Sequence, residues 1–422
     1  MQIGAVADDI TGATDLCLML SRSGLRTIQL IGLPAPGAPL PAADAVVIAL
    51  KSRTIPAAEA VALSTAAAEL LRAGGARQIL FKYCSTFDST DRGNIGPVVE
   101  ALLALTGSDL TIACPAFPAA GRTVFKGHLF VGDRLLSESP LRDHPLTPMR
   151  DPDLVRVLQR QTVLPVGKVE ISTIRQGVTA VRAALGEAQA AGVRIVVTDT
   201  LEDSDLLVLG RAVADLPLVT GGSGIGLGLA ANVTSGGAFA SARMATPAGR
   251  SAILAGSCSA ATRGQIAALE AAGWPARAID VEAALAGRET AAELIAWIIA
   301  QPEGAAPLLY TSAAPEQLAV LQARYGREAL GAFLERLLSE VGCGIVASGV
   351  RRLIVAGGET AGAVLAALGV TALEIGPEIA PGVPWTRSLG EPNLVLALKS
   401  GNFGDADFFL TAWSLLAEGS DV

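Results

Sequence analysis

The stretch "VADDITGATDL", residues 6–16, places two adjacent carboxylates, Asp8 and Asp9, where an apolar run ends. The preceding "MQIGAV" predicts a short buried strand, and the following "TGATDLCLMLSRSG" has the spacing of a helix that ends at Gly24. Ligands of open α/β sheets usually bind at such a strand-to-helix edge. Asp9 or Thr11 could cap the helix, but a cap explains only one member of the pair. We therefore interpret this turn as part of a binding site.

Apolar runs of strand length alternate with helical segments along most of the chain, with helices expected at about Ala57–Ala73 and Ile95–Leu105 and a long one ending near Glu340. This rhythm predicts an α/β protein of two domains, each with a mainly parallel sheet flanked by helices, and an active-site cleft between them. The polar segment "SARMATPAGRS" sets the expected boundary at 1–243 and 244–422. The rhythm breaks at "GRTVFKGHLFVGDRLL", residues 121–136, which predicts a β-hairpin.

Composition narrows the class of protein. The chain has 422 residues, 51% of them hydrophobic and 17% charged, which predicts well-packed sheets. Its net charge of -8 gives no electrostatic reason to expect a nucleic acid or an anionic membrane as partner. Five scattered cysteines without CxxC spacing and the lack of a signal peptide favour a cytoplasmic protein. The uncharged stretch Leu216–Ala242 is glycine-rich, so we interpret it as a loop and a buried helix.

The first half has four strand ends that carry charged residues. They are "ADDITGATD", "ALKSRT", "FKYCSTFDST" and "CPAFPAAGRT", and in a parallel sheet they would share one edge. Arginines there suit a carboxylate, so we expect a pocket for a small hydroxylated acid. Its candidate residues are Asp8, Asp9, Lys51, Arg53, Lys82, Asp88, Arg92 and Arg122. Asn94 begins a helix, as ligand contact or as cap, and His128 could reach the pocket from the hairpin; neither histidine predicts a metal site.

The second half has three strand ends rich in glycine and hydroxyl groups. They are "AGSCSAAT" (255–262), "AGGETAGAV" (356–364) and "LKSGNFGD" (398–405). Such ends hold phosphates through backbone amides, which predicts nucleotide binding, although Ser259 and Thr360 could serve as helix caps. Glu359 would need a magnesium ion, a ribose hydroxyl or a free amide beside it. The alternative, an NAD(P)-dependent oxidoreductase, rests on "TGGSGIGLG" (220–228), which does not match GxGxxG; we interpret it as a tight loop that could touch a phosphate.

In this order, "ADDITGATD", "KSRT", "KYCSTFDST", "RGNIGPV", "CPAFPAAGRTVFKGHLFVGD", "HPLTPM", "GSCS", "GGETAG" and "KSGNFG" resemble the four-carbon acid sugar kinase family. "KYCSTFDST" is similar to the branch that acts on 3-oxo-tetronates rather than to the erythronate and threonate kinases, which remain an alternative.

The resemblance implies an N-terminal domain that binds the sugar acid, a C-terminal domain that binds ATP, and Mg²⁺-dependent transfer of the γ-phosphoryl group to the terminal (C4) hydroxyl. It implies ATP-binding roles for Ser257, Ser259, Gly357, Gly358, Glu359, Thr360 and Gly401, and an acid pocket of Asp8, Asp9, Arg53, Lys82, Asp88 and Arg122. We hypothesise that Arg53 and Arg122 clamp the carboxylate, that Asp9 or Asp88 orients the hydroxyl, and that Lys82 neutralises the moving group. A non-catalytic nucleotide-binding regulator and a homodimer are options that the sequence leaves open.

Overall fold

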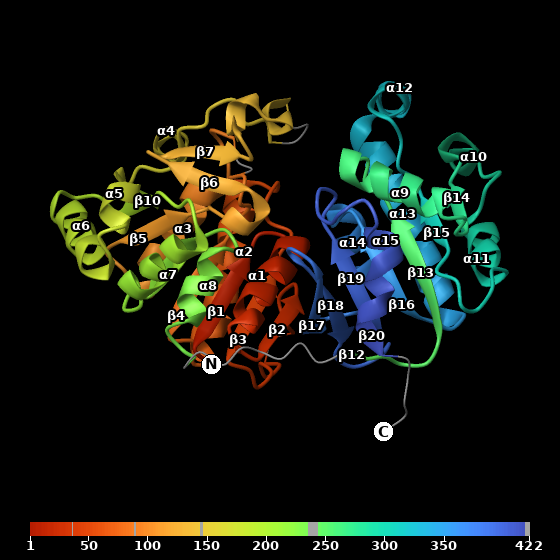
Figure 1. Cartoon of the computed structure of the whole chain (residues 1–422), viewed down its shortest axis with the longest axis horizontal. Helices are drawn as coiled ribbons and strands as arrows, with labels where there is room; N and C mark the ends of the chain where they lie inside the picture. Colours follow the sequence, from red (N-terminus) through yellow and green to blue (C-terminus); the bar gives the residue numbers. More distant parts are fainter. Residues whose placement is uncertain (36, 88–89, 144–146, 235–243, 418–422) are drawn as a thin grey trace. The chain divides into compact units, whose positions relative to one another are not determined.

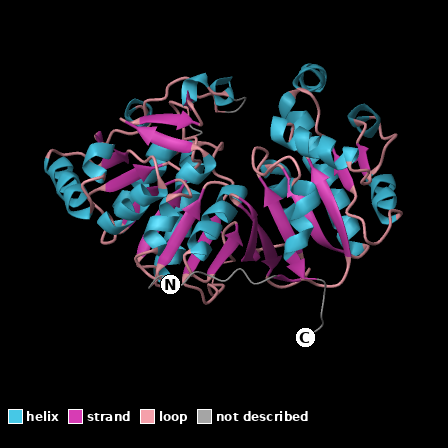
Figure 2. Cartoon of the chain, in the orientation of Figure 1, coloured by secondary structure: helices cyan, strands magenta, loops and turns pink. Residues whose placement is uncertain are grey.

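The computed structural model describes residues 1–35, 37–87, 90–143, 147–234 and 244–417. The chain divides into two compact units, Met1–Ala240 and Ser241–Val422 (Figure 1). The boundary expected from the sequence falls at the end of a segment, 235–243, that lies outside the described residues. Each unit is an α/β structure in which helices pack on a mainly parallel sheet (Figure 2), as the sequence predicted.

The first unit has an eight-stranded parallel core. Its strands run in the spatial order β2-β3-β1-β4-β11-β5-β10-β9. They are β1 Ile3–Ala7, β2 Thr27–Ile31, β3 Ala45–Ala49, β4 Gln78–Lys82, β5 Thr111–Cys114, β9 Val166–Val169, β10 Ile195–Thr198 and β11 Leu218–Gly221. Every residue of β1, β3 and β4 is buried, as expected for strands covered on both faces.

The helices of the first unit lie on both faces of its sheet. They are α1 Ile10–Arg22, α2 Ala57–Ala73, α3 Ile95–Thr106, α4 Leu154–Gln159, α5 Ile171–Ile174, α6 Val178–Ala190, α7 Asp203–Ala212 and α8 Ile225–Ala230. The chain leaves β1 through α1 toward β2, but leaves β3 through α2 in the opposite direction toward β4. Right-handed crossovers in opposite directions place α1 and α2 on opposite faces. The carboxyl end of β1 is therefore the switch point at which α/β sheets bind ligands.

The predicted hairpin is confirmed as a three-stranded antiparallel sheet of β6 Arg122–Phe125, β7 His128–Val131 and β8 Arg134–Leu135. In the glycine-rich stretch after residue 216, the predicted buried helix is confirmed as α8, whereas residues 218–221, which were included in the predicted loop, form the strand β11. The end of this stretch, from residue 235, lies outside the described residues.

The second unit contains a seven-stranded sheet in the order β14-β15-β13-β16-β19-β18-β17. Its strands are β13 Arg250–Ala255, β14 Ala276–Ala278, β15 Leu308–Tyr310, β16 Val350–Ala356, β17 Ala372–Ala380, β18 Val383–Ser388 and β19 Val395–Lys399. The first five in spatial order are parallel, and β18 pairs antiparallel with both β19 and β17. The short strands β12 Met244–Ala245 and β20 Leu416–Ala417 pair separately.

The helices of the second unit are α9 Ala260–Ala271, α10 Val281–Leu285, α11 Ala291–Ile299, α12 Pro315–Tyr325, α13 Arg327–Ala347, α14 Gly358–Ala367 and α15 Phe408–Thr411. The single long helix expected to end near Glu340 was wrong. Two helices, α12 and α13, meet at Gly326, whose φ of 78° breaks the helical backbone, and the second helix extends to Ala347.

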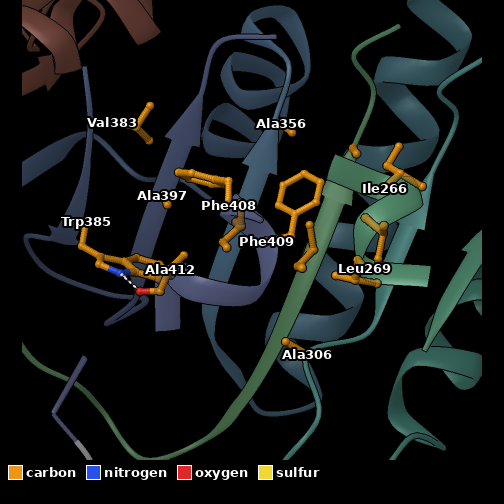
Figure 3. Close-up of a cluster of buried hydrophobic side chains, with 14 of the residues drawn as sticks. Ile266, Leu269, Ala306, Ala356, Val383, Trp385, Ala397, Phe408, Phe409 and Ala412 are labelled. Atoms are coloured by element: carbon orange, nitrogen blue, oxygen red, sulfur yellow. Dashed lines mark hydrogen bonds between the residues drawn. The ribbon is translucent and has the colours of Figure 1, made fainter. Parts of the chain in front are cut away.

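A buried apolar cluster fixes the positions of β19 and α9 in this unit (Figure 3). Phe408 and Phe409 of α15 pack with Ile266 and Leu269 of α9 against the sheet. Trp385 and Ala412 belong to the same cluster, and the indole Nε1 of Trp385 donates a hydrogen bond to the carbonyl oxygen of Ala412 (2.9 Å). The cluster therefore packs α9 and α15 against the sheet. Among the described helices, none combines the length and apolar character that crossing a bilayer requires.

Candidate functional site

Three adjacent strands bring an ionic cluster to one edge of the first unit. Asp8 and Asp9 follow β1, Lys82 ends β4, and Arg53 lies four residues after β3. Since β1 lies between β3 and β4 and all three are parallel, their carboxyl ends are neighbours. Backbone hydrogen bonds from Asp8 N to Lys82 O (3.0 Å) and from Ser52 N to Asp8 O (3.0 Å) fix the three ends together. The predicted grouping of these four side chains at this edge is what the structure contains.

Arg53 binds both aspartates. Its Nε and Nη2 donate to Asp8 Oδ2 (2.9 Å) and Oδ1 (2.8 Å), and Nη2 also donates to Asp9 Oδ1 (2.6 Å). Lys82 Nζ lies 3.4 Å from the same Asp9 oxygen. The other Asp9 oxygen accepts from Gly12 N (3.1 Å), so Asp9 also caps α1. The cap interpretation of Asp9 is therefore confirmed, and its part in a binding site stays a prediction.

The electrostatics of the cluster keep Asp9 ionised. Burial raises the pKa of the Asp9 carboxyl, but Arg53 and Lys82 outweigh burial and hold that pKa well below its usual range. Burial likewise lowers the pKa of Lys82, and the two aspartates reverse this effect and raise it. Asp8 and Lys82 are only 5% and 3% exposed, so these charges are little screened by water. A carboxylate this acidic is a good hydrogen-bond acceptor but a weak base.

Gly12 leaves the space in which Lys82 meets Asp9. A Cβ at position 12 would lie 1.9 Å from Lys82 Nζ and 2.2 Å from Asp9 Oδ1. Gly12→Ala is therefore expected to break this ion pair and to lower kcat/KM by about tenfold or more in any reaction that uses the cluster. Gly186→Ala in α6 is the control, because nothing lies within 4 Å of its added Cβ. Equal kinetics of the two variants would mean that the Asp9–Lys82 contact has no role in activity.

A second buried carboxylate, Asp15, was missed by the sequence analysis. It lies on α1, is 5% exposed, and faces Lys82, Arg122 and Ser223. Neither Asp15 Oδ1 nor Ser223 Oγ makes a hydrogen bond of normal geometry to any described residue. Burial raises the pKa of Asp15 to about 6, against the opposing effects of Lys82 and the Ser223 hydroxyl. Perturbed carboxyl groups with unused oxygens are typical of functional sites.

Several predicted pocket residues have other surroundings. Arg92 is exposed and lines a surface pocket of about 410 Å³ with Arg150 and Arg160. His128 is half-buried, and its Nδ1 lies 3.0 Å from the carbonyl oxygen of Lys126. Among the described residues, no hydrogen bond or ion pair connects Arg92 or His128 to the Asp8–Asp9 cluster. Asp88 lies outside the described residues.

Asn94 holds the segment that follows β3. Its Nδ2 donates to the carbonyl oxygens of Ser52 (2.7 Å), Arg53 (3.2 Å) and Ile55 (2.9 Å). The side chain therefore shapes the segment that carries Arg53 and makes no capping bond to α3. The nearby Gly96 donates its backbone N–H to the side-chain oxygen of Gln161 (3.0 Å), so this glycine serves packing rather than the approach of a ligand.

The glycines of "TGGSGIGLG" have a packing explanation. A Cβ at Gly221, Gly222 or Gly224 would lie 2.3 to 2.5 Å from the carbonyl oxygens of residues 114–116. The segment is thus pressed against the chain that follows β5, which accounts for its composition without a dinucleotide. This packing argues against the oxidoreductase alternative and against a phosphate contact at these glycines.

The three glycine-rich ends of the second unit meet at one place, as predicted. They follow β13, β16 and β19, which are adjacent and parallel. A Cβ on Gly401 would lie 2.4 Å from Ser257 Oγ and 3.1 Å from Ser259 Oγ, and a Cβ on Gly357 would lie 3.2 Å from Ser257 N. Ser259 caps α9 by accepting from Thr262 N (3.1 Å), so its cap role is confirmed.

The first turn of α14 suits an anion. Its N-cap is Gly357, with φ 123° and no capping side chain, so the first amides of this ten-residue helix are not bonded by a cap. Thr360 is buried, whereas Gly358 and Glu359 are exposed at the same turn. Within the described residues no group of three acidic, histidine or cysteine side chains is arranged to hold a metal ion.

Comparisons with known proteins find one family model in each of the two units. A family model described as a sugar-binding N-terminal domain matches residues 3–229, and one described as a nucleotide-binding C-terminal domain matches residues 252–409. The chain therefore belongs to the four-carbon acid sugar kinase family, which confirms the resemblance seen in the sequence.

Relatives within that family match this chain over nearly their full length. The 3-oxo-tetronate kinase of Burkholderia multivorans is 53% identical over 412 residues, covering 96% of this chain and 95% of the relative. The 3-oxo-tetronate kinase of Pseudomonas fluorescens is 53% identical over 423 residues, covering 99% and 97%. The crystal structure of a Salmonella typhimurium LT2 protein, provisionally described as a tRNA synthase, is 41% identical with a TM-score of 0.88, covering 99% of this chain and 100% of that one.

Proposed function

We propose that this protein transfers the γ-phosphoryl group of ATP to the C4 hydroxyl of a 3-oxo-tetronate, which yields the 4-phosphate. The observation that carries the proposal is the pair of sites at switch points: an ionic cluster after β1 and a glycine- and hydroxyl-lined cradle beside β13. The identity of 53% to 3-oxo-tetronate kinases extends over both units and supports the choice of substrate.

Phosphoryl transfer requires positioning and charge stabilisation more than covalent chemistry. In this proposal Arg53 does not bind the substrate carboxylate, because its Nε and Nη2 already donate to the two oxygens of Asp8. Arg53 orients the two aspartates instead. Arg122 and Lys82 attract the substrate anion, and ionised Asp9 accepts a hydrogen bond from a substrate hydroxyl. Asp15 takes the proton of the attacking hydroxyl, directly or through one water.

The nucleotide is proposed to lie on the second unit. The uncapped start of α14 and the side-chain-free positions 357 and 401 suit phosphate oxygens, and the Ser257 and Thr360 hydroxyls can donate to them. Mg²⁺ usually enters kinase sites through nucleotide phosphates and one or two carboxylates, and Glu359 is the acidic residue in the first turn of α14.

Removal of Mg²⁺ by EDTA is expected to abolish turnover and to leave the apoprotein folded.

A coupled ADP-release assay with Mg²⁺ and a panel of four-carbon acids tests the function. We expect 3-oxo-tetronate to give the highest kcat/KM, with phosphate found on O4 of the product. Turnover of D-erythronate or L-threonate alone would assign the chain to the sister activity. Binding of ATP without ADP release for any acid would indicate a regulator, and a change in nicotinamide absorbance would indicate an oxidoreductase. A homodimer and a cytoplasmic location stay predictions, the first of which sedimentation equilibrium can test.

A further inference from the structure

Lys399, the last residue of β19, is buried beneath the loop that follows it. It is 0% exposed, and four acceptors share the three N–H donors of its Nζ. They are Thr262 Oγ1 of α9 and the carbonyl oxygens of Ser400, Gly401 and Phe403, each at 3.1 Å. No described carboxylate pairs with this ammonium group. A buried cation that binds only neutral oxygens is costly, so it needs a functional explanation.

Gln265, on the side of α9 that faces the same loop, continues the pattern. Its Nε2 donates to the carbonyl oxygens of Phe403 (3.1 Å), Gly404 (2.9 Å) and Asp405 (3.0 Å), and Gln265 is 1% exposed. Together, Lys399 and Gln265 hold five carbonyl groups of the loop, those of residues 400, 401, 403, 404 and 405, turned toward α9.

Because these carbonyl groups point toward α9, the amide group that follows each of them points the other way. Across a trans peptide bond the N–H of the next residue points opposite to the C=O, and the described loop contains no cis bond. The N–H groups of residues 401, 402, 404, 405 and 406 therefore point away from Lys399 and Gln265, and none donates to an acceptor within the described residues. The N–H of Phe403, which follows a carbonyl that is not held, bonds to Ser400 O (3.2 Å). Successive outward amides form anion-binding concavities.

This loop also adjoins the other two nucleotide-site segments. Gly401 approaches Ser257 so closely that a side chain there would collide with the Ser257 hydroxyl, and it would be in tight contact with the Ser259 hydroxyl. Thr262 connects α9 to both Lys399 and the loop, since its hydroxyl donates to Gly401 O (3.0 Å) and accepts from Lys399. Burial lowers the pKa of Lys399 to about 7, while the carbonyl oxygens around it favour the charged form. A bound polyphosphate would favour that form further.

The geometry points to Lys399 and Gln265 as positioning residues that keep the 400–406 loop in the form of a backbone-amide cradle for the phosphate groups of the nucleotide. This inference rests on the proposed function in so far as ATP is the ligand of the second unit. It adds two side chains that do not touch the ligand, and it assigns the recognition to phosphate rather than to the base or the ribose.

Binding measurements on the full chain test the inference. Lys399→Met and Gln265→Met remove the donors at similar side-chain length, and calorimetry compares a non-hydrolysable ATP analogue with adenosine. We expect the Kd of the analogue to rise at least tenfold in each variant, while the Kd of adenosine stays within twofold. Gln78→Met is the matched control, because Gln78 Nε2 also donates to two carbonyl oxygens, those of Val213 (2.9 Å) and Leu216 (2.7 Å), but in the first unit; it should change neither Kd.

Unchanged analogue affinity in the folded Gln265→Met variant would overturn the inference, as would an equal loss of analogue and adenosine binding, which indicates a merely structural role. If Lys399→Met does not fold, the Gln265 variant alone still decides. The measurement needs no sugar acid, so wild-type protein that binds the analogue but releases no ADP would contradict the proposed function and leave this test intact. Failure of the wild type to bind the analogue would overturn both.

Discussion

Arg53→Ala is expected to lower kcat/KM for the sugar acid by about 10²- to 10³-fold. The guanidinium makes three hydrogen bonds to Asp8 and Asp9, of 2.6 to 2.9 Å, at a site where Asp8 is 5% exposed. Truncating one partner of a buried, hydrogen-bonded charge pair costs about 2–5 kcal/mol, and each 1.4 kcal/mol is tenfold in rate. Of the described cations that pair with these two carboxylates, Lys82 would remain beside Asp9. Asp9 would keep its cap bond to Gly12 N but lose the bond that holds its Oδ1 next to Asp8.

Arg182→Ala is the control for this prediction. Arg182 Nη2 also pairs with an aspartate, Asp215 Oδ2, at 3.0 Å, but the two side chains are 50% and 86% exposed. Exposed pairs contribute about 0–1 kcal/mol, so its kinetics should stay within a few-fold of wild type. Arg53→Lys keeps the charge but cannot bridge two carboxylates, and it should recover only part of the activity. Wild-type kinetics in a folded Arg53→Ala enzyme would remove the cluster from the active site.

The sequence predicted the parts of the fold that depend on local pattern. Strand and helix spacing predicted the two α/β units, and polar residues at strand ends predicted that Asp8, Asp9, Arg53 and Lys82 meet. In both units the first four strands of the main sheet have the same spatial order, second-third-first-fourth, as in β2-β3-β1-β4 and β14-β15-β13-β16. The loop after the first strand is thus at a switch point in each unit, which explains why both groups of polar strand ends could be predicted from the sequence.

Contacts between residues distant in sequence could not be predicted in this way. Asn94 looked like a cap or ligand contact, but it bonds three carbonyls of the 52–55 segment, more than 38 residues away. Lys399 was read only as part of a glycine-rich motif, because its burial depends on α9 packing over it. One signal for Asp15 was present: an acidic residue nearly two turns after the cap Asp9, in a helix whose buried residues are mostly apolar, where burial of a charge is costly.

Asp15→Asn should produce the clearest chemical change. If Asp15 accepts the proton of the attacking hydroxyl, its replacement removes a contribution of about 10²- to 10⁴-fold to kcat with little change in KM for ATP. Wild-type kcat/KM should fall as the pH drops below the Asp15 pKa of about 6, because the protonated acid cannot act as a base. This acidic limb should disappear in the variant. Lys82, Arg122 and Asp9 also face this carboxyl group, so the midpoint should shift when Lys82 is replaced.

The free energy of unfolding gives a second measurement of the same substitution, and it should change in the opposite direction to kcat. The folded-state pKa of Asp15 is raised from 3.8 to about 6, so the folded protein binds this proton more tightly than the unfolded chain. The ionised carboxylate therefore destabilises the fold increasingly between pH 4 and pH 6, and the cost, at most about 3 kcal/mol, persists above that range. Asparagine carries no such cost. The free energy of unfolding of Asp15→Asn should equal or exceed that of wild type at pH 7.5, and the gain should vanish near pH 4.

Asp199→Asn separates this behaviour from that of a structural carboxylate. Asp199 is 0% exposed, and its oxygens accept the backbone N–H groups of Lys126 (2.8 Å), Gly127 (2.8 Å) and Ile171 (3.0 Å). The NH₂ group of an asparagine at this position would face a backbone N–H, which is also a donor, so this variant should be less stable than wild type. It should keep the acidic limb of the pH profile. A stable Asp15→Asn enzyme that retained both wild-type kcat and that limb would show that the proton goes to another group. Natural active sites trade stability for chemistry, and a variant that gains the first while losing the second is the signature expected of Asp15.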